Sequence, residues 1–452
     1  MRLRKTITTI VATAILLAGW QLFAVIANQP ELIPSLPRLV RTLCEWLVSG
    51  SFYQSVGATI LRGVLGMSIS FVCAIGMAGL FARFEWVYEL FRPLLAIMRS
   101  IPVISFILLA LIFLNPESIP LMIAFLTMFP LLTENLTRGI LDLRPGLSIM
   151  ARQFHIKCSN VLFQIIYPQL KPFLYSGLAS AAGFGWRAII MGEVLSQCAF
   201  GIGSEMKRAQ NFISVPELLA WTIVAVFISF FFDKGISKVA DITPKISFAN
   251  EDQTTPTPTL SVLDTKDISY QYGIQHFSHS FQKGIIYGIS APSGKGKTTL
   301  LNLIGGILLP TEGEIHPTRH FGIATIFQQP QLLPHLTAEE NIILPLSSFL
   351  TEEKARRIAQ KHLQEMEMEP FGNRYPKELS YGQQQRIAIA RALAYPSPLL
   401  LMDEPFKGLD EALSHRIIER IREMQMKEER IILFTSHNPD EIRLLADEVI
   451  YL

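Results

Sequence analysis

The stretch APSGKGKTT at Ala291–Thr299 decides how the C-terminal half of this chain is read. It lies between an apolar run, Ile285–Ser290, and a run of helical character, Thr298–Gly306. It is close to the pattern G-x-x-x-x-G-K-[ST], in which backbone N–H groups at a helix N-terminus face phosphates. Ala291 replaces the first glycine, and its methyl group is accommodated if φ is negative there. The stretch therefore predicts a strand, a phosphate-binding loop and a helix.

Each residue type in this loop has its own task. Gly294 and Gly296 allow the backbone to approach the phosphates closely. Lys297 can neutralise the β- and γ-phosphates, and Thr298 can ligate Mg²⁺. We expect the nucleotide to be contacted by Ala291, Ser293, Gly294, Lys295, Gly296, Lys297, Thr298 and Thr299.

An acidic pair follows a second apolar run, LLLMDEP at Leu399–Pro405. A strand there would deliver both carboxylates at its polar end. Asp403 would hold the Mg²⁺ shell, and Glu404 would be the general base that polarises the attacking water. LSYGQQQR at Leu379–Arg386 precedes this run, and TSH at Thr435–His437 follows it.

In this order, the motifs resemble the nucleotide-binding domain of ABC transporters over nearly all of residues 260–452. The family signature LSGGQ is Leu379–Gln383 here, with Tyr381 in place of the first glycine. Ser380 can cap the following helix, with Gln383 at the capping-box position. In the family this helix N-terminus faces the γ-phosphate bound by the opposite subunit. The resemblance implies nucleotide contacts by Ser380, Gly382 and Gln383.

The resemblance also implies roles for single residues. Gln328 matches the glutamine that senses Mg²⁺ and water, His437 the histidine on the γ-phosphate, and Asp410 the aspartate that communicates across the dimer. Tyr272 lies where the family stacks an aromatic ring on adenine, although it or Tyr270 could equally pack in the core. The implied catalytic residues are Glu404, His437 and Gln328, and the implied Mg²⁺ ligands are Thr298, Gln328 and Asp403.

The N-terminal half is apolar enough for a membrane. Half of the 452 residues are hydrophobic, and the runs before about residue 240 approach the ~20 residues that cross a bilayer. Lys and Arg are concentrated in the segments that six spans place on the inner side, so we expect both termini in the cytoplasm. The predicted spans are 7–27, 57–82, 94–114, 119–137, 173–196 and 217–236.

The chain therefore reads as two domains. We expect a transmembrane permease domain over 1–239, an all-α bundle of about six helices. A Pro-rich linker, 240–260, would join it to a nucleotide-binding domain over 261–452, an α/β P-loop ATPase fold with a helical subdomain and a mostly parallel sheet. The net charge of +2 implies no nucleic-acid partner. Four cysteines without C-x-x-C spacing argue against a metal site or a disulfide framework.

Residues 30–240 resemble the permeases of binding-protein-dependent importers, in particular the nitrate/sulfonate/taurine and thiamine-precursor group. Importers carry an E-A-A-x-x-x-G loop between spans four and five, and here His155 stands at the glycine. We expect the amphipathic stretch Leu147–Phe163 to lay apolar side chains into a groove of the ATPase domain; the alternative is an interfacial helix. The other matching stretches are Ile33–Leu43, Ala58–Gly66 and Arg92–Phe106.

Two ionisable residues fall inside the fifth span. Each costs on the order of 3 kcal/mol at a bilayer centre, so such groups usually face a bundle interior or a water path. Arg187 and Glu193 are six positions apart and point to different faces. Arg187 either lines the pathway and favours an anionic substrate, or pairs with a neighbouring span.

The combined resemblance implies an ATP-driven importer in the bacterial cytoplasmic membrane. It binds ATP and Mg²⁺, forms a homodimer that closes two ATP, and receives its solute from an extracytoplasmic solute-binding protein. The lipid bilayer is its other partner. Two alternatives stay open: an exporter with the same ATPase, and a membrane-anchored ATPase that regulates a partner.

Overall fold

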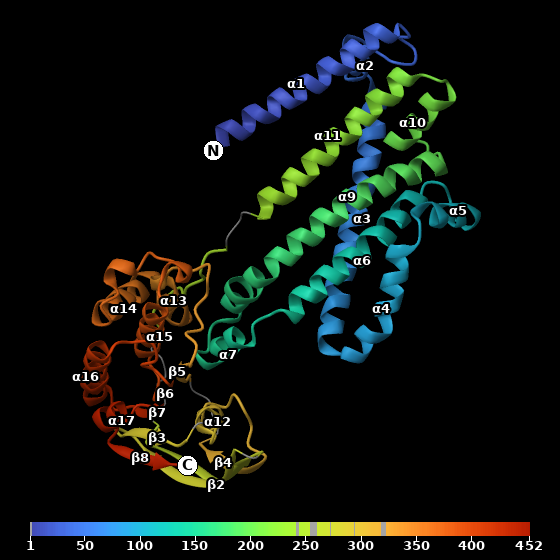
Figure 1. Ribbon diagram of the computed structural model, residues 1–452. Coiled ribbons are helices and arrows are strands. Elements are labelled where there is room, and N and C mark those ends of the chain that lie inside the picture. The colour runs from blue at the N-terminus through green and yellow to red at the C-terminus, as the bar shows by residue number, and fades with distance from the viewer. Residues whose placement is uncertain (1, 241–243, 254–259, 272, 293, 318–321) are drawn as a thin grey trace. The chain divides into compact units, whose positions relative to one another are not determined.

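The computed structural model describes all residues except 1, 241–243, 254–259, 272, 293 and 318–321, and leaves out the side chains of 2–6, 9 and 10 (Figure 1). The chain forms two compact units. Unit 1 combines Met1–Leu143 with Gln169–Thr243, and unit 2 combines Arg144–Pro168 with Pro244–Leu452. A segment from the middle of the apolar half is thus part of the C-terminal unit. Of the predicted linker 240–260, residues 241–243 and 254–259 lie outside the described residues.

Unit 1 is helical. Its helices are α1 (Arg2–Ala27), α2 (Leu36–Trp46), α3 (Gly50–Arg83), α4 (Glu85–Ser100), α5 (Val103–Phe113), α6 (Ile119–Leu141), α9 (Tyr167–Ser196), α10 (Ile202–Asn211) and α11 (Val215–Ala240). The helices α3 and α6 pack closely, because a Cβ on Gly66 would lie 2.6 Å from the Cβ of Ala124. Small residues on both helices therefore permit this close packing, as is common between membrane helices.

Four helices are long and apolar enough to cross a membrane: α3, α6, the continuous stretch Cys158–Ser196 and α11. The predicted span 94–114 is wrong as a single helix, because α4 and α5 meet at an angle of 94°. Pro102 lacks an N–H group and holds Ile101 in an extended conformation, which ends α4. The predicted span 7–27 falls on α1, and among its described residues the apolar part is Val11–Ala27. The described residues thus supply four spans, or five if the bent pair is one.

Unit 2 contains two sheets. The strands β2 (Ile274–Gln282), β1 (Val262–Tyr270) and β4 (Glu312–His316) pair antiparallel in that order. The second sheet is parallel, in the order β5 (Ala324–Ile326), β6 (Leu399–Asp403), β7 (Ile431–Thr435), β3 (Ile286–Ser290) and β8 (Glu448–Tyr451). All residues of β6 and β7 are buried, as expected for central parallel strands covered on both faces. The predicted parallel sheet is confirmed; the sequence reading missed the antiparallel one.

The helices of unit 2 outside its first segment are α12 (Lys297–Ile304), α13 (Ala338–Leu346), α14 (Glu352–Glu365), α15 (Tyr381–Ala394), α16 (Glu411–Glu428) and α17 (Pro439–Leu445). The helices α13, α14 and α15 pack on one another, away from the antiparallel sheet (Figure 1). In the parallel sheet, Asp403 lies opposite Thr435, and Ile289 does as well. The carboxyl ends of β6, β7 and β3 therefore meet at one edge.

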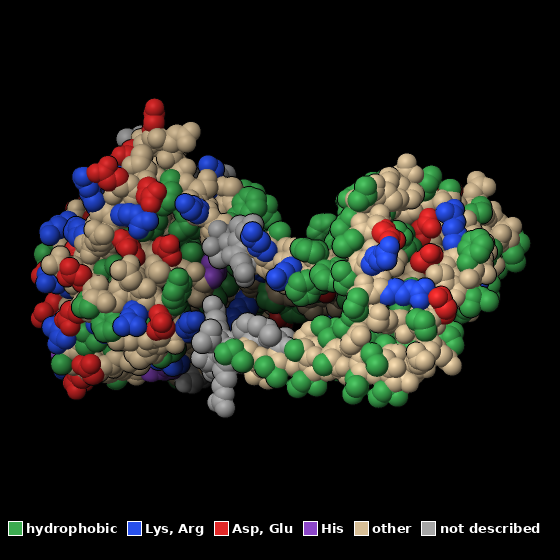
Figure 2. Space-filling view, turned by 90° about the horizontal axis from the view of Figure 1, so that it is seen from above, with side chains coloured by type: hydrophobic (Ala, Val, Ile, Leu, Met, Phe, Trp, Pro, Cys, Tyr) green, Lys and Arg blue, Asp and Glu red, His purple; other side chains and the backbone are tan. Residues whose placement is uncertain are grey.

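The surfaces of the two units differ. Lys, Arg, Asp and Glu side chains cover the visible face of unit 2, whereas hydrophobic side chains are abundant on unit 1 (Figure 2). The long helices α3 and α11 expose large apolar residues such as Leu61, Val72 and Phe231. Such a surface is stable in lipid and unfavourable in water.

Candidate functional site

The loop before α12 has the backbone that a phosphate-binding turn requires. Gly294 and Gly296 have φ of +82° and +89°, in the left-handed region that favours glycine. A Cβ on Gly296 would lie 2.7 Å from the carbonyl oxygen of Gly273. Ala291 is not among the residues of positive φ, so its methyl group is accommodated without strain. The buried Lys297 donates from Nζ to the Ala291 carbonyl oxygen at 2.7 Å, across this loop.

A hydroxyl and carboxylate cluster lies where β6 and β7 end. Thr298 donates to Asp403 Oδ2 at 2.9 Å, and Thr435 donates to Asp403 Oδ1 at 2.8 Å. Burial raises the pKa of Asp403, and the two threonine hydrogen bonds counteract it. A buried carboxylate beside a hydroxyl is a set of hard oxygen ligands, which is what Mg²⁺ prefers. Thr298 and Asp403 thus fit the metal that the sequence implies.

Glu404 is held from several directions. Its Oε1 lies 2.9 Å from His437 Nε2, its Oε2 lies 3.4 Å from Lys407 Nζ, and its N–H donates to Thr435 Oγ1 at 3.1 Å. Its backbone has φ of +47°, a strained conformation for a residue with a side chain. Partial burial raises the pKa of Glu404, but hydrogen bonds from Gln328 and Lys407 outweigh it, and the pKa is lower than usual. This carboxylate is therefore ionised at neutral pH.

The signature segment forms the predicted cap of α15. Ser380 accepts from the Gln383 N–H at 3.3 Å, and the Gln383 side chain accepts from the Ser380 N–H at 2.9 Å. The capping box is confirmed, and the helix begins at Tyr381. Gly382 follows in the first turn of this helix. The signature residues belong to α15, whereas the phosphate-binding loop precedes α12. Tyr381, which lies between Ser380 and Gly382 in the sequence, also donates from its phenol oxygen to the main-chain carbonyl oxygen of Gln328.

The remaining predicted positions divide in three ways. Asp410 caps α16 by accepting from the Leu413 N–H at 2.9 Å, a local use of its carboxylate that the sequence reading missed. Tyr272 and Ser293 lie outside the described residues. Tyr270 packs partly buried against the core beneath β1 and β2. Lys295 is exposed and Thr299 half-buried in the loop before and at the start of α12.

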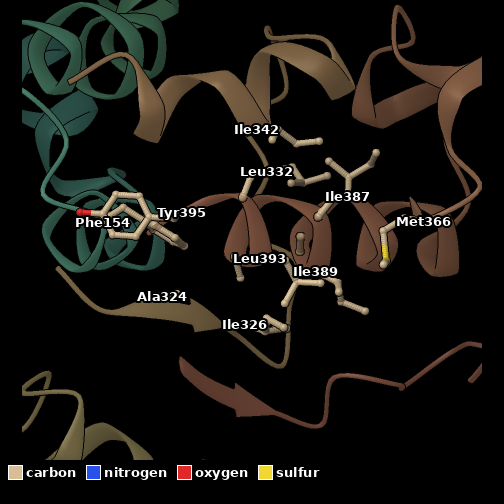
Figure 3. Packing of buried hydrophobic residues seen from close by; sticks show 14 of the residues in the cluster. Phe154, Ala324, Ile326, Leu332, Ile342, Met366, Ile387, Ile389, Leu393 and Tyr395 are labelled. Carbon is tan, nitrogen blue, oxygen red and sulfur yellow. The ribbon is translucent and has the colours of Figure 1, made fainter. Parts of the chain in front are cut away.

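The segment Arg144–Pro168 is built into the core of unit 2. It forms α7 (Pro145–Gln153), α8 (Cys158–Asn160) and a π-helical stretch (Val161–Ile166). Its apolar side chains join the same buried cluster as β5, α13 and α15 (Figure 3). From this segment the cluster contains Leu147, Met150, Ala151, Phe154, Ile156 and Ile165. The predicted apolar contact with the ATPase domain is confirmed.

Hydrogen bonds fix this segment at specific points. Gln153 donates to the Gly305 carbonyl oxygen at 2.7 Å and accepts from the Ile323 N–H at 2.9 Å. Asn160 donates to Ser347 Oγ at 2.8 Å. The stretch is broken between α7 and α8, where His155 has φ of +46°. His155 is where the importer loop carries glycine, and the left-handed backbone explains why glycine suits that place.

Unit 1 contains a buried charge network around Glu193, whose partners the sequence reasoning did not identify. Glu193 has no exposed area and accepts from Arg62 NH1 at 2.7 Å, from Thr59 and from the Gly203 N–H. Arg62 also donates to Glu117 Oε2 at 2.6 Å. The network joins α3, the turn before α6 and the α9–α10 connection. Arg62 and Glu193 are 131 positions apart, so helix spacing alone could not reveal the pair.

Arg187 lies on a different face of α9. It is exposed on unit 1. The structure gives this side chain no hydrogen bond or ion pair with any described residue. The alternative in which it pairs with a neighbouring span therefore has no support within one chain. An apolar pocket of unit 1, about 660 Å³, is lined by Ile60, Tyr175 and Phe231 among others, and not by Arg187.

Comparisons with known proteins agree with this geometry. Residues 274–407 match the family model described as ABC transporter, and residues 68–233 match the model described as binding-protein-dependent transport system inner membrane component. The thiamine import ATP-binding protein ThiQ of Yersinia pseudotuberculosis is 34% identical over 205 residues, 42% of this chain and 86% of that protein. The ABC transporter ATP-binding protein MJ0796 of Methanocaldococcus jannaschii is 34% identical over 201 residues, 40% of this chain and 85% of that protein.

Other relatives are longer than the matched part. The Fe(3+) ions import ATP-binding protein FbpC of Rhizobium etli is 35% identical over 189 residues, 40% of this chain. The chain spans 54% of that protein. Among solved structures, the dimeric post-hydrolysis state of the MJ0796 cassette bound to ADP and Pi has a TM-score of 0.40 at 32% identity, covering 42% of this chain and 94% of that chain.

A chain with a phosphate-binding loop, an acidic strand end and a capped signature helix on this sheet belongs to the ABC transporter family. In particular, it is a multi-pass membrane protein in which a binding-protein-dependent permease domain is fused to an ABC ATPase domain.

Proposed function

We propose that this chain is the ATP-driven subunit of an importer, combining the pathway and its motor in one polypeptide. The carrying observation is the packing of Arg144–Pro168 in unit 2. These residues lie inside the permease match, 68–233, yet their apolar side chains complete the core of the cassette match, 274–407. A movement of the cassette therefore has to move this segment with it. The functional domains in this proposal are the permease domain 1–239 and the nucleotide-binding domain 261–452, joined by the linker 240–260. The segment Arg144–Pro168 transmits movement between the two domains.

Hydrolysis is assigned to the cluster at the ends of β6 and β7. Glu404 is ionised and held by His437 and Lys407, so it can accept the proton of an attacking water. Gln328 reaches the same carboxylate and can orient that water. Lys297 and the N–H groups around Gly296 would hold the phosphates. Mg²⁺ bound through Thr298 and Asp403 would neutralise charge on the β- and γ-phosphates.

A homodimer completes the site. The signature helix begins at Tyr381 and the phosphate-binding loop ends at Lys297, and in ABC transporters such segments face each other across two subunits. Two copies of this chain would therefore close two ATP, with Asp410 at the boundary. An extracytoplasmic solute-binding protein would deliver the solute, and the ATPase unit and both termini would lie on the cytoplasmic side of a bacterial cytoplasmic membrane.

The substrate class is inferred from Arg187. Relatives are named for import of Fe(3+) ions, glucose, spermidine/putrescine and thiamine, so their names do not agree on one chemistry. A cationic side chain on an exposed face of a span, without a partner in the described part of its chain, is costly in lipid and favourable beside water. Placed along the pathway of a dimer, it favours a small anion such as a sulfonate, taurine or nitrate.

The test is uptake by proteoliposomes containing the full chain and ATP inside. Labelled alkanesulfonates, taurine, nitrate and thiamine precursors are offered outside with their binding proteins. Glu404→Gln should abolish accumulation while ATP binding remains. Arg187→Gln should weaken uptake of the anion at least tenfold, whereas Arg208→Gln, which changes an exposed arginine paired with Glu205, should not. Accumulation that needs no binding protein, or export from preloaded vesicles, would contradict import.

A further inference from the structure

Tyr381 connects the start of α15 with two loops of unit 2. Its phenol oxygen donates to the main-chain carbonyl oxygen of Gln328 at 2.7 Å. Its ring lies against Gly408, where a Cβ would be 2.7 Å from Tyr381 Cδ1. The side chain is 42% exposed, so the contact is at the surface of the unit and open to a partner.

Two glycines make this contact possible. Gly408 has φ of +79° and belongs to the loop that leads to Asp410. A Cβ on Gly382 would lie 2.6 Å from the Gly408 carbonyl oxygen, which is too close for any side chain without movement. The first turn of α15 therefore rests directly on the Gly408 loop, and the Tyr381 ring covers the place where they meet.

The contact leads on to the catalytic carboxylate. The side chain of Gln328 acts on Glu404, where it lowers the pKa of the carboxyl, while the main-chain carbonyl oxygen of Gln328 accepts from the Tyr381 phenol. Ser380, the N-cap of α15, directly precedes Tyr381 in the sequence. The signature helix is thus joined through Tyr381 to Gln328, and the side chain of Gln328 influences Glu404.

We propose that Tyr381 is a positioning residue that couples the two ATP sites of the dimer. This inference rests on the proposed function, in which Ser380 and Gly382 contact the nucleotide held by the second copy. When that nucleotide draws the N-terminus of α15 toward it, the phenol carries the movement to Gln328 of its own site. Binding of ATP at one site therefore alters the environment of Glu404 in the other site. The glycine that the family signature has at this position has no side chain that could donate a hydrogen bond to Gln328.

The experiment compares Tyr381→Phe and Tyr381→Gly with the parent in the purified full chain. Tyr381→Phe keeps the ring against Gly408 and removes the hydroxyl; Tyr381→Gly removes both. The control is Tyr53→Phe, because Tyr53 belongs to unit 1, is also exposed and donates to a main-chain carbonyl oxygen, that of Leu47, at 2.9 Å. Binding of a fluorescent ATP analogue is titrated in a Glu404→Gln background, so that hydrolysis does not contribute. Hydrolysis against ATP concentration is measured in the unmodified background.

We expect a Hill coefficient above 1 for the parent and for Tyr53→Phe. For both Tyr381 variants the Hill coefficient should fall to about 1. The ATP concentration at half-saturation should change about fivefold, which is the effect expected from the loss of one such hydrogen bond or of a modest coupling between sites. Unchanged Hill coefficients and half-saturation in the variants, or a parent that binds without cooperativity, would overturn the coupling role while leaving the importer assignment intact. A parent that binds no ATP would instead overturn the proposed function.

Discussion

The ring of Phe154 meets the ring of Tyr395 edge-on, with centroids 5.2 Å apart and ring planes at 86° (Figure 3). Phe154 comes from the apolar half of the sequence, and Tyr395 follows the end of α15. The guanidinium of Arg391 lies 5.5 Å from the centre of the same Phe154 ring, and it also donates to the carbonyl oxygens of Pro330 and Gln331. The buried ring of Phe154 therefore contacts the signature helix, and Arg391 of that helix in turn holds the loop that follows Gln328.

Phe154→Ala should uncouple uptake from hydrolysis. Phe154 has no exposed area, so its loss leaves a cavity and costs about 3–5 kcal/mol of unit stability. We expect ATP hydrolysis to persist at reduced thermal stability while uptake in proteoliposomes falls at least tenfold. Phe349→Ala is the matched control, because Phe349 also contacts Tyr395 but lies outside Arg144–Pro168. Equal loss of uptake per ATP in both variants would contradict a special role of the segment.

Thr435→Val should weaken Mg²⁺ binding. Its hydroxyl orients Asp403 at 2.8 Å, and removal of such a supporting hydrogen bond typically costs 10–100-fold in metal affinity, so about tenfold or more is expected here. Titration of Mn²⁺ in the presence of ATP, by electron paramagnetic resonance, measures this directly. Thr325→Val on β5, which is separated from β7 by β6, is the control, since the buried Thr325 hydroxyl has no partner among the described residues. Its metal affinity should match the parent.

Arg62→Met should destabilise unit 1. It leaves the fully buried Glu193 carboxylate without its cation, a change that typically costs about 3–5 kcal/mol. Thermal unfolding in detergent should begin well below that of the parent. Arg208→Met breaks an exposed pair with Glu205, worth about 0–1 kcal/mol, and should unfold like the parent. If the two variants melt together, the network is not a structural element of the unit.

His155→Gly should stabilise unit 2. A non-glycine residue pays on the order of 1 kcal/mol for a left-handed backbone, and His155 is exposed, so little packing is lost. Unfolding of the purified chain by urea, followed by the fluorescence of the tyrosines of unit 2, should shift to higher concentration. The neighbouring Arg152→Gly lies within α7 and should shift it the other way by a similar amount. A shift in the same direction for both would show that backbone strain is not the cause.

Local chemistry could be predicted from the sequence, whereas long-range geometry could not. The phosphate loop, the acidic pair and the Ser380 cap each lie within a few consecutive residues, so the pattern alone indicates strand, turn and helix. The parallel sheet followed from strands that alternate with helices. The docking of the stretch around Phe154 was predictable because its apolar face is periodic and the chain places it between two spans.

What the sequence did not show depends on partners far along the chain. Arg62 stood in a stretch read for its family resemblance, and nothing nearby marked Glu193 as its counterion. The bend after α4 could not be predicted from hydropathy, because the mean hydropathy of a segment does not reflect the backbone N–H that Pro102 lacks. Tyr381 looked like a defect in a glycine-rich motif; its bond to Gln328 appears when α15 and that loop are seen together.

The placement of Arg144–Pro168 has a consequence for biosynthesis. Phe154 leaves the ribosome about 240 residues before Tyr395, and at roughly 5–20 residues per second the delay is on the order of 10–50 s. During that time the apolar face of α7 has no cassette to cover it, while the spans on either side of it are already being made. Until then, the exposed apolar face of α7 can aggregate or bind to the lipid surface. Binding of chaperones to the nascent chain should therefore be strongest before the last two hundred residues have been synthesised.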